Sequence, residues 1–217
     1  MKTLSGPSIK AKNQDNPKNL VILMHGIGAD GNDLIGLASN WSHNMPDTEF
    51  LSPNAPFTCN MSGTGYQWFG FVDKDLVRIR AEVSQVALIL NNFIDDQLKI
   101  RNLNDTNLAL VGFSQGAMLA LHVGLRRKKK CAGIVGYSGM LLDPDNLQNE
   151  VESKPPIVLV HGDIDPVITP LSLPNAETKL KNLEIPVETH MREGLGHGID
   201  AEGVEIGKTF LHKNLQS

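Results

Sequence analysis

A serine between two glycines lies near the middle of the chain, where residues 112–116 read GFSQG. The G-x-S-x-G pattern is weak alone, but here it ends an apolar run at 108–113 and begins an apolar helical pattern near Gly116. A sharp turn from a strand into a helix exposes a serine hydroxyl, and small residues on both sides make its strained backbone tolerable. We therefore interpret Ser114 as a candidate nucleophile for acyl transfer.

A serine hydroxyl becomes a nucleophile when a base accepts its proton and an acid orients that base. We choose His197 as the base, because residues 194–198 read GLGHG and the glycines allow a loop to present the imidazole. This loop lies between a short strand expected near 187–191 and the last helical pattern. The remaining histidines considered as bases have settings typical of surface, helix or packing residues: His43, His122, His161, His190 and His212.

The acid is expected between the serine and the histidine, which is one of the chain orders that such triads use. Residues 161–167 read HGDIDPV and directly follow the apolar run 157–160, so a carboxylate there lies at the end of a strand. We choose Asp165, because Pro166 stiffens the loop after it, and keep Asp163 as the alternative.

Acyl transfer also needs hydrogen-bond donors for the oxyanion, and two backbone N–H groups suffice. The residue after the nucleophile, Gln115, supplies one candidate. The loop after an early strand should supply the other, and residues 25–31 read HGIGADG directly after the run 20–24, so we choose the Ile27 N–H. The same loop fits the dinucleotide pattern G-x-G-x-x-G. That interpretation needs an acidic residue at the end of the second strand, whereas Glu49 begins its apolar segment.

Buried strands and helices must hold these residues in place. Continuous apolar runs, typical of strands buried on both faces of a parallel sheet, lie at 20–24, 108–111, 133–137 and 157–160. Helical spacing of apolar residues appears at 83–94, 117–123, 173–183 and 204–211. The alternation predicts an α/β fold with right-handed crossovers. The stretch 54–71 has no clear period, and we expect it to be an active-site loop.

Length and composition narrow the class of protein. The 217 residues favour one domain over 1–217, with a polar N-terminal extension at 1–17. Residues 1–19 leave room for a short edge strand. The net charge of −4 provides no basic field for nucleic acid. We expect no membrane insertion, because no apolar run approaches about 18 residues. With no signal segment and only two cysteines, we expect a cytoplasmic location, no disulfide framework and no metal site.

Taken together, these motifs resemble the phospholipase/carboxylesterase family of the α/β-hydrolase superfamily, which includes acyl-protein thioesterases and small bacterial carboxylesterases. The matching segments lie at 23–34, 53–56, 67–69, 112–117, 161–167 and 196–198. They occur in the family's order and span the chain from about 18 to 212.

The resemblance implies an α/β-hydrolase fold with a mainly parallel central sheet, helices on both faces and no large lid domain. It implies hydrolysis of carboxylic esters or thioesters, such as a lysophospholipid or an acylated protein, without a cofactor. A homodimer is compatible with it, because relatives are often dimers. The site residues it carries over are Ser114, Asp165 and His197 as the triad, Ile27 and Gln115 as oxyanion donors, and Trp68 and Val167 at the acyl site.

Two departures from the family pattern touch the acyl pocket. Phe69 is followed by Gly70 where thioesterase members typically have Asp, and the segment 140–142 after Gly139 reads MLL, without the Trp that some have. The sequence therefore leaves the acyl chain length and the natural substrate open. Two other functions remain as alternatives: a non-catalytic scaffold that binds an acyl ligand, and a serine peptidase.

Overall fold

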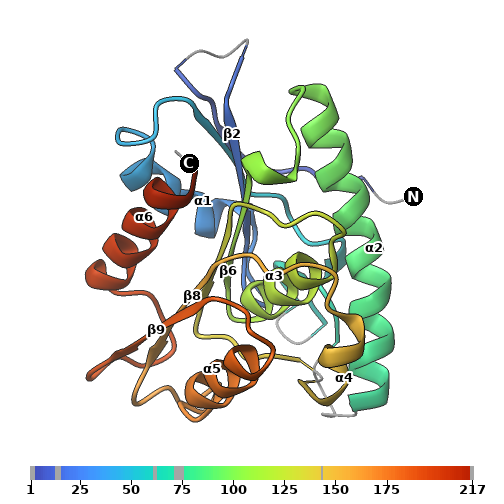
Figure 1. Ribbon diagram of the computed structural model, residues 1–217, viewed down its shortest axis with the longest axis vertical. Coiled ribbons are helices and arrows are strands. Elements are labelled where there is room, and N and C mark those ends of the chain that lie inside the picture. Colours follow the sequence, from blue (N-terminus) through green and yellow to red (C-terminus); the bar gives the residue numbers. More distant parts are fainter. Residues whose placement is uncertain (1–2, 13–15, 61–62, 71–75, 143, 216–217) are drawn as a thin grey trace.

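The computed structural model describes residues 3–12, 16–60, 63–70, 76–142 and 144–215. A seven-stranded sheet runs through its centre in the order β1-β3-β2-β6-β7-β8-β9 (Figure 1). Its strands are β1 (Ser8–Ile9), β2 (Asn19–Met24), β3 (Thr48–Leu51), β6 (Leu108–Phe113), β7 (Gly133–Tyr137), β8 (Ile157–Gly162) and β9 (Val187–Arg192). Every neighbouring pair is parallel except β1 and β3, which confirms the mainly parallel sheet that the sequence predicts.

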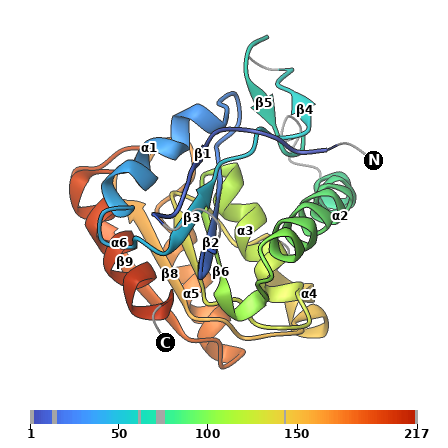
Figure 2. The same ribbon diagram turned by 90° about the horizontal axis from the view of Figure 1, so that it is seen from above.

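Helices cover both faces of this sheet, as predicted (Figure 2). α1 (Gly31–Trp41) and α6 (Ala201–Leu215) pack on one face, and α2 (Leu76–Ile100), α3 (Gln115–Arg126), α4 (Pro144–Glu150) and α5 (Ser172–Asn182) lie on the other. Alternate residues of β2 enter the two cores: Ile22 packs beneath α2 and α3, while Val21 and Leu23 pack beneath α1 and α6. Burial on both faces explains why the strands are continuous apolar runs.

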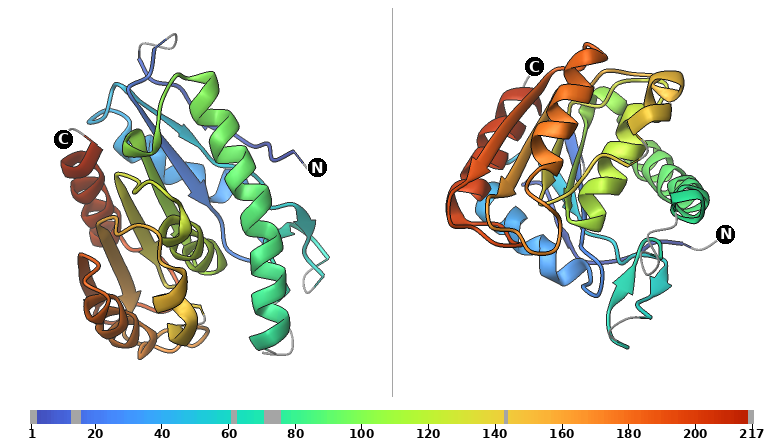
Figure 3. Two further views of the ribbon diagram at one scale, coloured as in Figure 1. Left: turned by 45° about the vertical axis from the view of Figure 1, so that its right-hand side comes forward. Right: turned by 90° about the horizontal axis from the view of Figure 1, so that it is seen from below.

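The predicted loop at 54–71 has more structure than its sequence indicates. It contains a two-stranded antiparallel sheet of β4 (Phe57–Thr58) and β5 (Tyr66–Gln67), which projects from the body of the molecule (Figure 3). Such short strands carry no readable alternation of apolar and polar residues. Parts of the predicted loop, residues 61–62 and 71, lie outside the described residues.

The N-terminal segment takes part in the sheet through β1. Ser8 pairs with Leu51 and Ile9 pairs with Phe50, and Leu4 is buried in the core beneath α2. The burial of Leu4 and the pairing of β1 with β3 both hold this segment against the sheet. The short edge strand expected within residues 1–19 is therefore present, whereas the polar composition of this segment did not indicate the burial of Leu4.

The parallel strands bring several loops to one edge of the sheet. The loops after β2, β6, β8 and β9 leave the carboxyl ends of their strands, where sheets of this kind bind ligands. In the described part of the chain no domain-sized insertion separates these loops from solvent, as the resemblance implied. None of the helices described is long and apolar enough to cross a membrane.

Candidate active site

Ser114 occupies a sharp turn between β6 and α3. Its φ is 53°, in the region that side chains disfavour, and its N–H donates to the Tyr137 carbonyl oxygen at 2.8 Å. The glycines on either side make the turn feasible. A Cβ on Gly112 would lie 2.3 Å from the Gly116 carbonyl carbon, and a Cβ on Gly116 would lie 1.9 Å from the Met24 oxygen. The predicted strand–turn–helix setting of this serine is therefore present.

The loop after β9 brings His197 to this serine. His197 Nε2 lies 3.0 Å from Ser114 Oγ, and its Nδ1 lies 2.7 Å from Asp165 Oδ2. A carboxylate accepts hydrogen bonds only, so Nδ1 carries the proton of the neutral ring and Nε2 has a free lone pair. An imidazole held in this way can accept the proton of a hydroxyl group.

Asp165 is buried and surrounded by donors. Its Oδ1 accepts the N–H groups of Val167 at 2.8 Å and Ile168 at 3.0 Å. Its Oδ2 lies 3.2 Å from His161 Nε2 in addition to its contact with His197. Burial alone would raise the pKa of Asp165, but the hydrogen bonds from His197, Ile168 and Val167 outweigh it and hold the pKa below its ordinary value. The carboxylate is thus ionised near neutral pH.

Asp163, the alternative acid, contacts the loop of His197 rather than its imidazole. Its Oδ1 accepts the N–H of Gly194 at 2.7 Å. On the other side of the histidine, the buried Ser138 donates its hydroxyl to the Gly198 carbonyl oxygen at 3.2 Å. The two contacts fix both ends of the short loop that presents the imidazole.

One candidate oxyanion donor directly follows the serine, and the other lies in the loop after β2. Gln115 begins α3, and the first N–H groups of a helix have no partner within it. Ile27 lies in the loop after β2, and within the described residues neither N–H has a hydrogen-bond partner. The loop approaches closely: a Cβ on Gly26 would lie 3.4 Å from Ser114 Cβ. Both N–H groups are therefore available to a ligand.

The side chain of Gln115 has a separate task. Its Oε1 accepts the Trp68 N–H at 2.7 Å, and its Nε2 donates to the Phe69 oxygen at 2.7 Å. Trp68 in turn donates its indole N–H to the His25 oxygen at 3.0 Å. These contacts connect the segments that carry the two donors.

The two residues expected at the acyl site have very different surroundings. Trp68 is fully buried under the loop after β2, whereas Val167 is 64% exposed. Ile164 and Leu171, in the same segment as Val167, are also exposed and give this rim an apolar surface. Val167 can therefore contact an acyl chain only on an open rim. Trp68 can affect the acyl site only through the loop that covers it.

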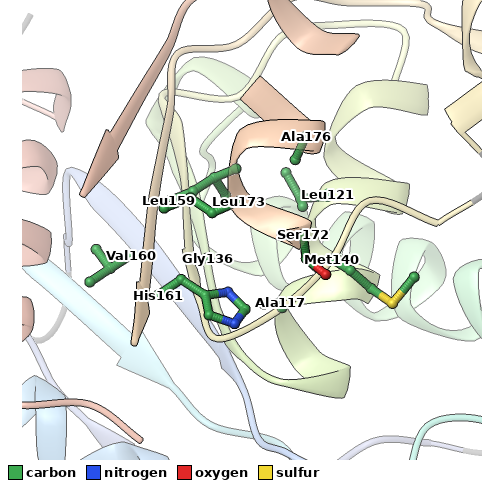
Figure 4. A pocket seen from close by; sticks show the side chains of 11 residues that line it. Ala117, Leu121, Gly136, Met140, Leu159, Val160, His161, Ser172, Leu173 and Ala176 are labelled. Atoms are coloured by element: carbon green, nitrogen blue, oxygen red, sulfur yellow. The ribbon is translucent and has the colours of Figure 1, made fainter. Parts of the chain in front are cut away.

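A small cavity lies behind the site between α3 and α5 (Figure 4). Its volume is about 10 Å³, the space of one water-sized probe. The side chains of Leu121, Leu159 and Leu173 contribute to its mostly apolar lining, and His161 borders it. It does not enclose an acyl chain. In the described part of the chain, no three His, Cys, Asp or Glu side chains gather as metal ligands do.

Sequence reasoning missed several residues that hold the site. His25 follows a buried strand within the quoted motif, a usable signal, yet it received no role. The contact of Ser138 with Gly198 spans 60 positions, and nothing in the local sequence indicates it. The second histidine on Asp165, His161, was assigned to packing or hydrogen bonding in general terms, and it lies in β8 against that carboxylate.

Known proteins resemble this chain over nearly its whole length. The family model described as Phospholipase/Carboxylesterase matches residues 5–215. Acyl-protein thioesterase 1 of Schizosaccharomyces pombe is 30% identical over 191 residues, which cover 84% of each chain. Acyl-protein thioesterase 1 of Saccharomyces cerevisiae is 28% identical over 99% of this chain and 100% of its own. The crystal structure of esterase PE8 has a TM-score of 0.94 at 38% identity and covers 98% of this chain and 100% of its own.

Proposed function

The chain belongs to the phospholipase/carboxylesterase family, and we propose that it hydrolyses carboxylic esters or thioesters through a Ser114–His197–Asp165 triad. The observation that supports this most strongly is the continuous series of contacts from the Asp165 carboxylate through the His197 ring to the Ser114 hydroxyl. Members of this family are hydrolases that act on ester bonds, and the residues they need occur here at contact distance.

In the proposed reaction, Ser114 Oγ attacks the acyl carbon while His197 Nε2 accepts its proton. The Oγ–C bond forms and the carbonyl electron pair moves to the oxygen. Asp165 stabilises the imidazolium that results. His197 then gives its proton to the departing alcohol or thiol, and the acyl group stays on Ser114. A water molecule repeats the sequence, so that the acid is released and the serine is restored.

The oxyanion of each tetrahedral intermediate is assigned to the N–H groups of Ile27 and Gln115. Loss of one such donor costs about 3 kcal/mol of transition-state stabilisation in other hydrolases. Both donors belong to the backbone, so a substitution removes neither directly. Their effect depends on how firmly the surrounding segments are held.

We further propose that short acyl groups are the preferred substrates. The cavity behind the site has room for about one water-sized group, and the apolar residues Val167 and Leu171 lie on an exposed rim. A short acyl group needs no enclosed channel, whereas a long chain that contacted the described residues of this rim would keep much of its surface in water. Lysophospholipids and acylated proteins are therefore second candidates.

We also propose a cytoplasmic location. Cys59 and Cys131 are both buried and neither forms a disulfide, as is ordinary in a reducing compartment. Burial raises the pKa of the Cys131 thiol to about 12, so this cysteine stays a neutral, unreactive core residue.

The test is hydrolysis of p-nitrophenyl esters from acetyl to palmitoyl, with Ser114→Ala as the matched control. We expect the highest kcat/KM with short acyl groups and only background hydrolysis by the control. A maximum with long chains would overturn the preference for short acyl groups and favour the second candidates. Equal rates for the two proteins would overturn the catalytic assignment and favour a scaffold that only binds acyl ligands. Cleavage of peptide anilides in preference to esters would indicate a peptidase.

A further inference from the structure

A buried histidine lies directly beneath the candidate oxyanion loop. The side chain of His25 is fully buried, and both of its ring nitrogens have partners. Its Nε2 lies 3.0 Å from the backbone nitrogen of Ala55, and its Nδ1 lies 2.7 Å from the Gly26 carbonyl oxygen. The ring plane is tilted against Trp68, with 5.5 Å between the ring centres. The proposed reaction uses none of these contacts directly.

These two contacts determine the tautomer of His25. The Ala55 N–H can only donate, so Nε2 must accept with its lone pair. The Gly26 oxygen can only accept, so Nδ1 must carry the hydrogen. Burial lowers the pKa of His25 below its ordinary value, although the hydrogen bond with Gly26 and the charges of Asp30 and Asp33 act in the opposite direction. A neutral ring satisfies both partners.

The carbonyl that accepts from His25 belongs to the peptide group that carries the Ile27 N–H. In a trans peptide the C=O and the N–H point in opposite directions. The Gly26 oxygen is held inside the loop by His25 and also accepts the Ala29 N–H at 3.3 Å. The Ile27 N–H is therefore directed away from the loop interior. A donor on the carbonyl oxygen also polarises the peptide and strengthens its N–H as a donor.

A second set of contacts ties this peptide to the other oxyanion donor. Trp68 holds the His25 oxygen, and the Gln115 side chain holds the backbone on both sides of the peptide bond between Trp68 and Phe69. The segments with the two N–H groups are thus joined through buried hydrogen bonds rather than through the loop alone.

We propose that His25 is a positioning residue of the oxyanion hole, which aims and polarises the Ile27 N–H through the Gly26 carbonyl. This inference rests on the proposed function, because it assigns the Ile27 N–H to an oxyanion. His25 touches no reacting atom. We therefore expect loss of the Nδ1–H donor to impair the chemical step more than substrate binding.

Two substitutions separate the two contacts of the ring. In His25→Asn the amide N–H occupies the position of Nδ1 and can donate to Gly26, but the acceptor for Ala55 is lost. In His25→Gln the amide oxygen reaches the position of Nε2 and can accept from Ala55, but the donor to Gly26 is lost. The pair is therefore matched: each variant keeps one contact and removes the other.

We expect opposite effects on activity and on stability. His25→Gln should lower kcat about tenfold, less than the ~10²–10³-fold loss of a whole oxyanion donor, with KM little changed. His25→Asn should keep most of kcat but lower Tm more, because it leaves a buried N–H unsatisfied. A trifluoromethyl ketone forms a hemiketal adduct with serine that carries the oxyanion. Its affinity for His25→Gln should fall by the same factor as kcat/KM. If kcat falls in both variants in proportion to Tm, or if His25→Gln keeps full kcat, the proposal is wrong.

The wild-type protein provides a test that does not depend on the folding of variants. Nitrogen-15 NMR of the histidine rings should show His25 protonated on Nδ1 and unprotonated on Nε2 at neutral pH. The opposite tautomer, or a charged ring, would overturn the proposal. The Ser114→Ala control tests the proposed function separately. Retained hydrolysis in that variant would rule out the proposed triad. The opposite His25 tautomer together with an inactive Ser114→Ala protein would rule out only the role of His25.

Discussion

Two buried carboxylates at opposite ends of the sheet have contrasting partners. Asp165 follows β8 at the carboxyl end of the strands and contacts two histidine rings and two backbone N–H groups. Glu49 lies in β3 next to Leu20, at the beginning of β2, and pairs with Arg101 and Lys10. Both lie in the same fold and both have a pKa held below the ordinary value.

The difference lies in what the partners can do. Arg101 forms two hydrogen bonds of 2.8 Å with Glu49, and Lys10 adds one of 2.6 Å, so permanent cations neutralise the carboxylate. The side chain of Asp165 faces backbone N–H groups and histidine rings, and one of these rings, His197, can gain a proton during a reaction. A permanent pair stabilises a fold, whereas a carboxylate beside a titratable ring can stabilise a charge that forms transiently.

The largest effect should come from removing the charge at the site. Asp165→Asn should lower kcat by up to ~10⁴-fold, because the amide no longer favours the His197 tautomer with a free Nε2. Asp163→Asn is the matched control, since the Asp163 side chain accepts the backbone N–H of Gly194 rather than binding the His197 ring. Ester hydrolysis by the two variants measures the contrast. Equal losses, or a larger loss in the control, would contradict the choice of Asp165.

At the other end of the sheet the effect should appear in stability. Glu49→Gln leaves the buried Arg101 without its counter-charge and should lower the free energy of unfolding by about 3 kcal/mol. Its kcat should stay close to that of the wild type. Urea unfolding and ester hydrolysis of the same preparation give both values. As a control, Lys10→Met removes the half-exposed partner and should cost less than about 1 kcal/mol. A loss of kcat at unchanged stability would show that Glu49 serves the reaction rather than the fold.

Gln115→Ala should have an intermediate effect on kcat. From its backbone donor alone, the sequence predicts little loss. The contacts of the side chain with Trp68 and Phe69 change this expectation to about a tenfold fall in kcat, since a 1 Å displacement can cost ~10²-fold. Steady-state kinetics would measure it. An unchanged kcat would show that the donors are held without this side chain.

The smallest effect should be a dependence of stability on pH at the acidic end. Burial alone would raise the pKa of Glu49, but Arg101 and Lys10 lower it below the ordinary value. A lowered folded-state pKa contributes stability above the ordinary glutamate value of about 4.3, and this contribution is lost as the pH falls through the folded-state value. The stability difference between wild type and Glu49→Gln should therefore shrink in urea unfolding below about pH 4. A constant difference down to about pH 3 would contradict the pairing.

The sequence predicts the sheet and its main helices because burial on both faces imposes long apolar runs. β7 has the same bounds, Gly133–Tyr137, in the sequence and in the structure. The β4–β5 hairpin was not predicted, because distant partners hold its segment: Gly28 donates to the Tyr66 oxygen at 2.8 Å, and Gln115 binds Trp68. A local pattern contains no information about such contacts.

More of the candidate site than of its supporting loops could be predicted from the sequence. Ser114, Asp165 and His197 are separated by up to 83 positions, yet each lies in a recognisable motif, and the structure brings them into contact. The exposure of Val167 and the burial of Trp68 depend on packing from several elements, so residue type alone could not determine them. The roles of supporting polar groups follow only from three-dimensional geometry.

Labelling with a fluorophosphonate shows whether Ser114 forms the covalent intermediate. Intact-protein and peptide mass spectrometry should find one phosphonyl group on Ser114 of the wild type, with loss of ester hydrolysis in proportion to labelling. Ser114→Ala should take up no label and hydrolyse no ester above background. A label on another residue would show that Ser114 is not the nucleophile. Hydrolysis at the wild-type rate by the Ser114→Ala protein would show the same.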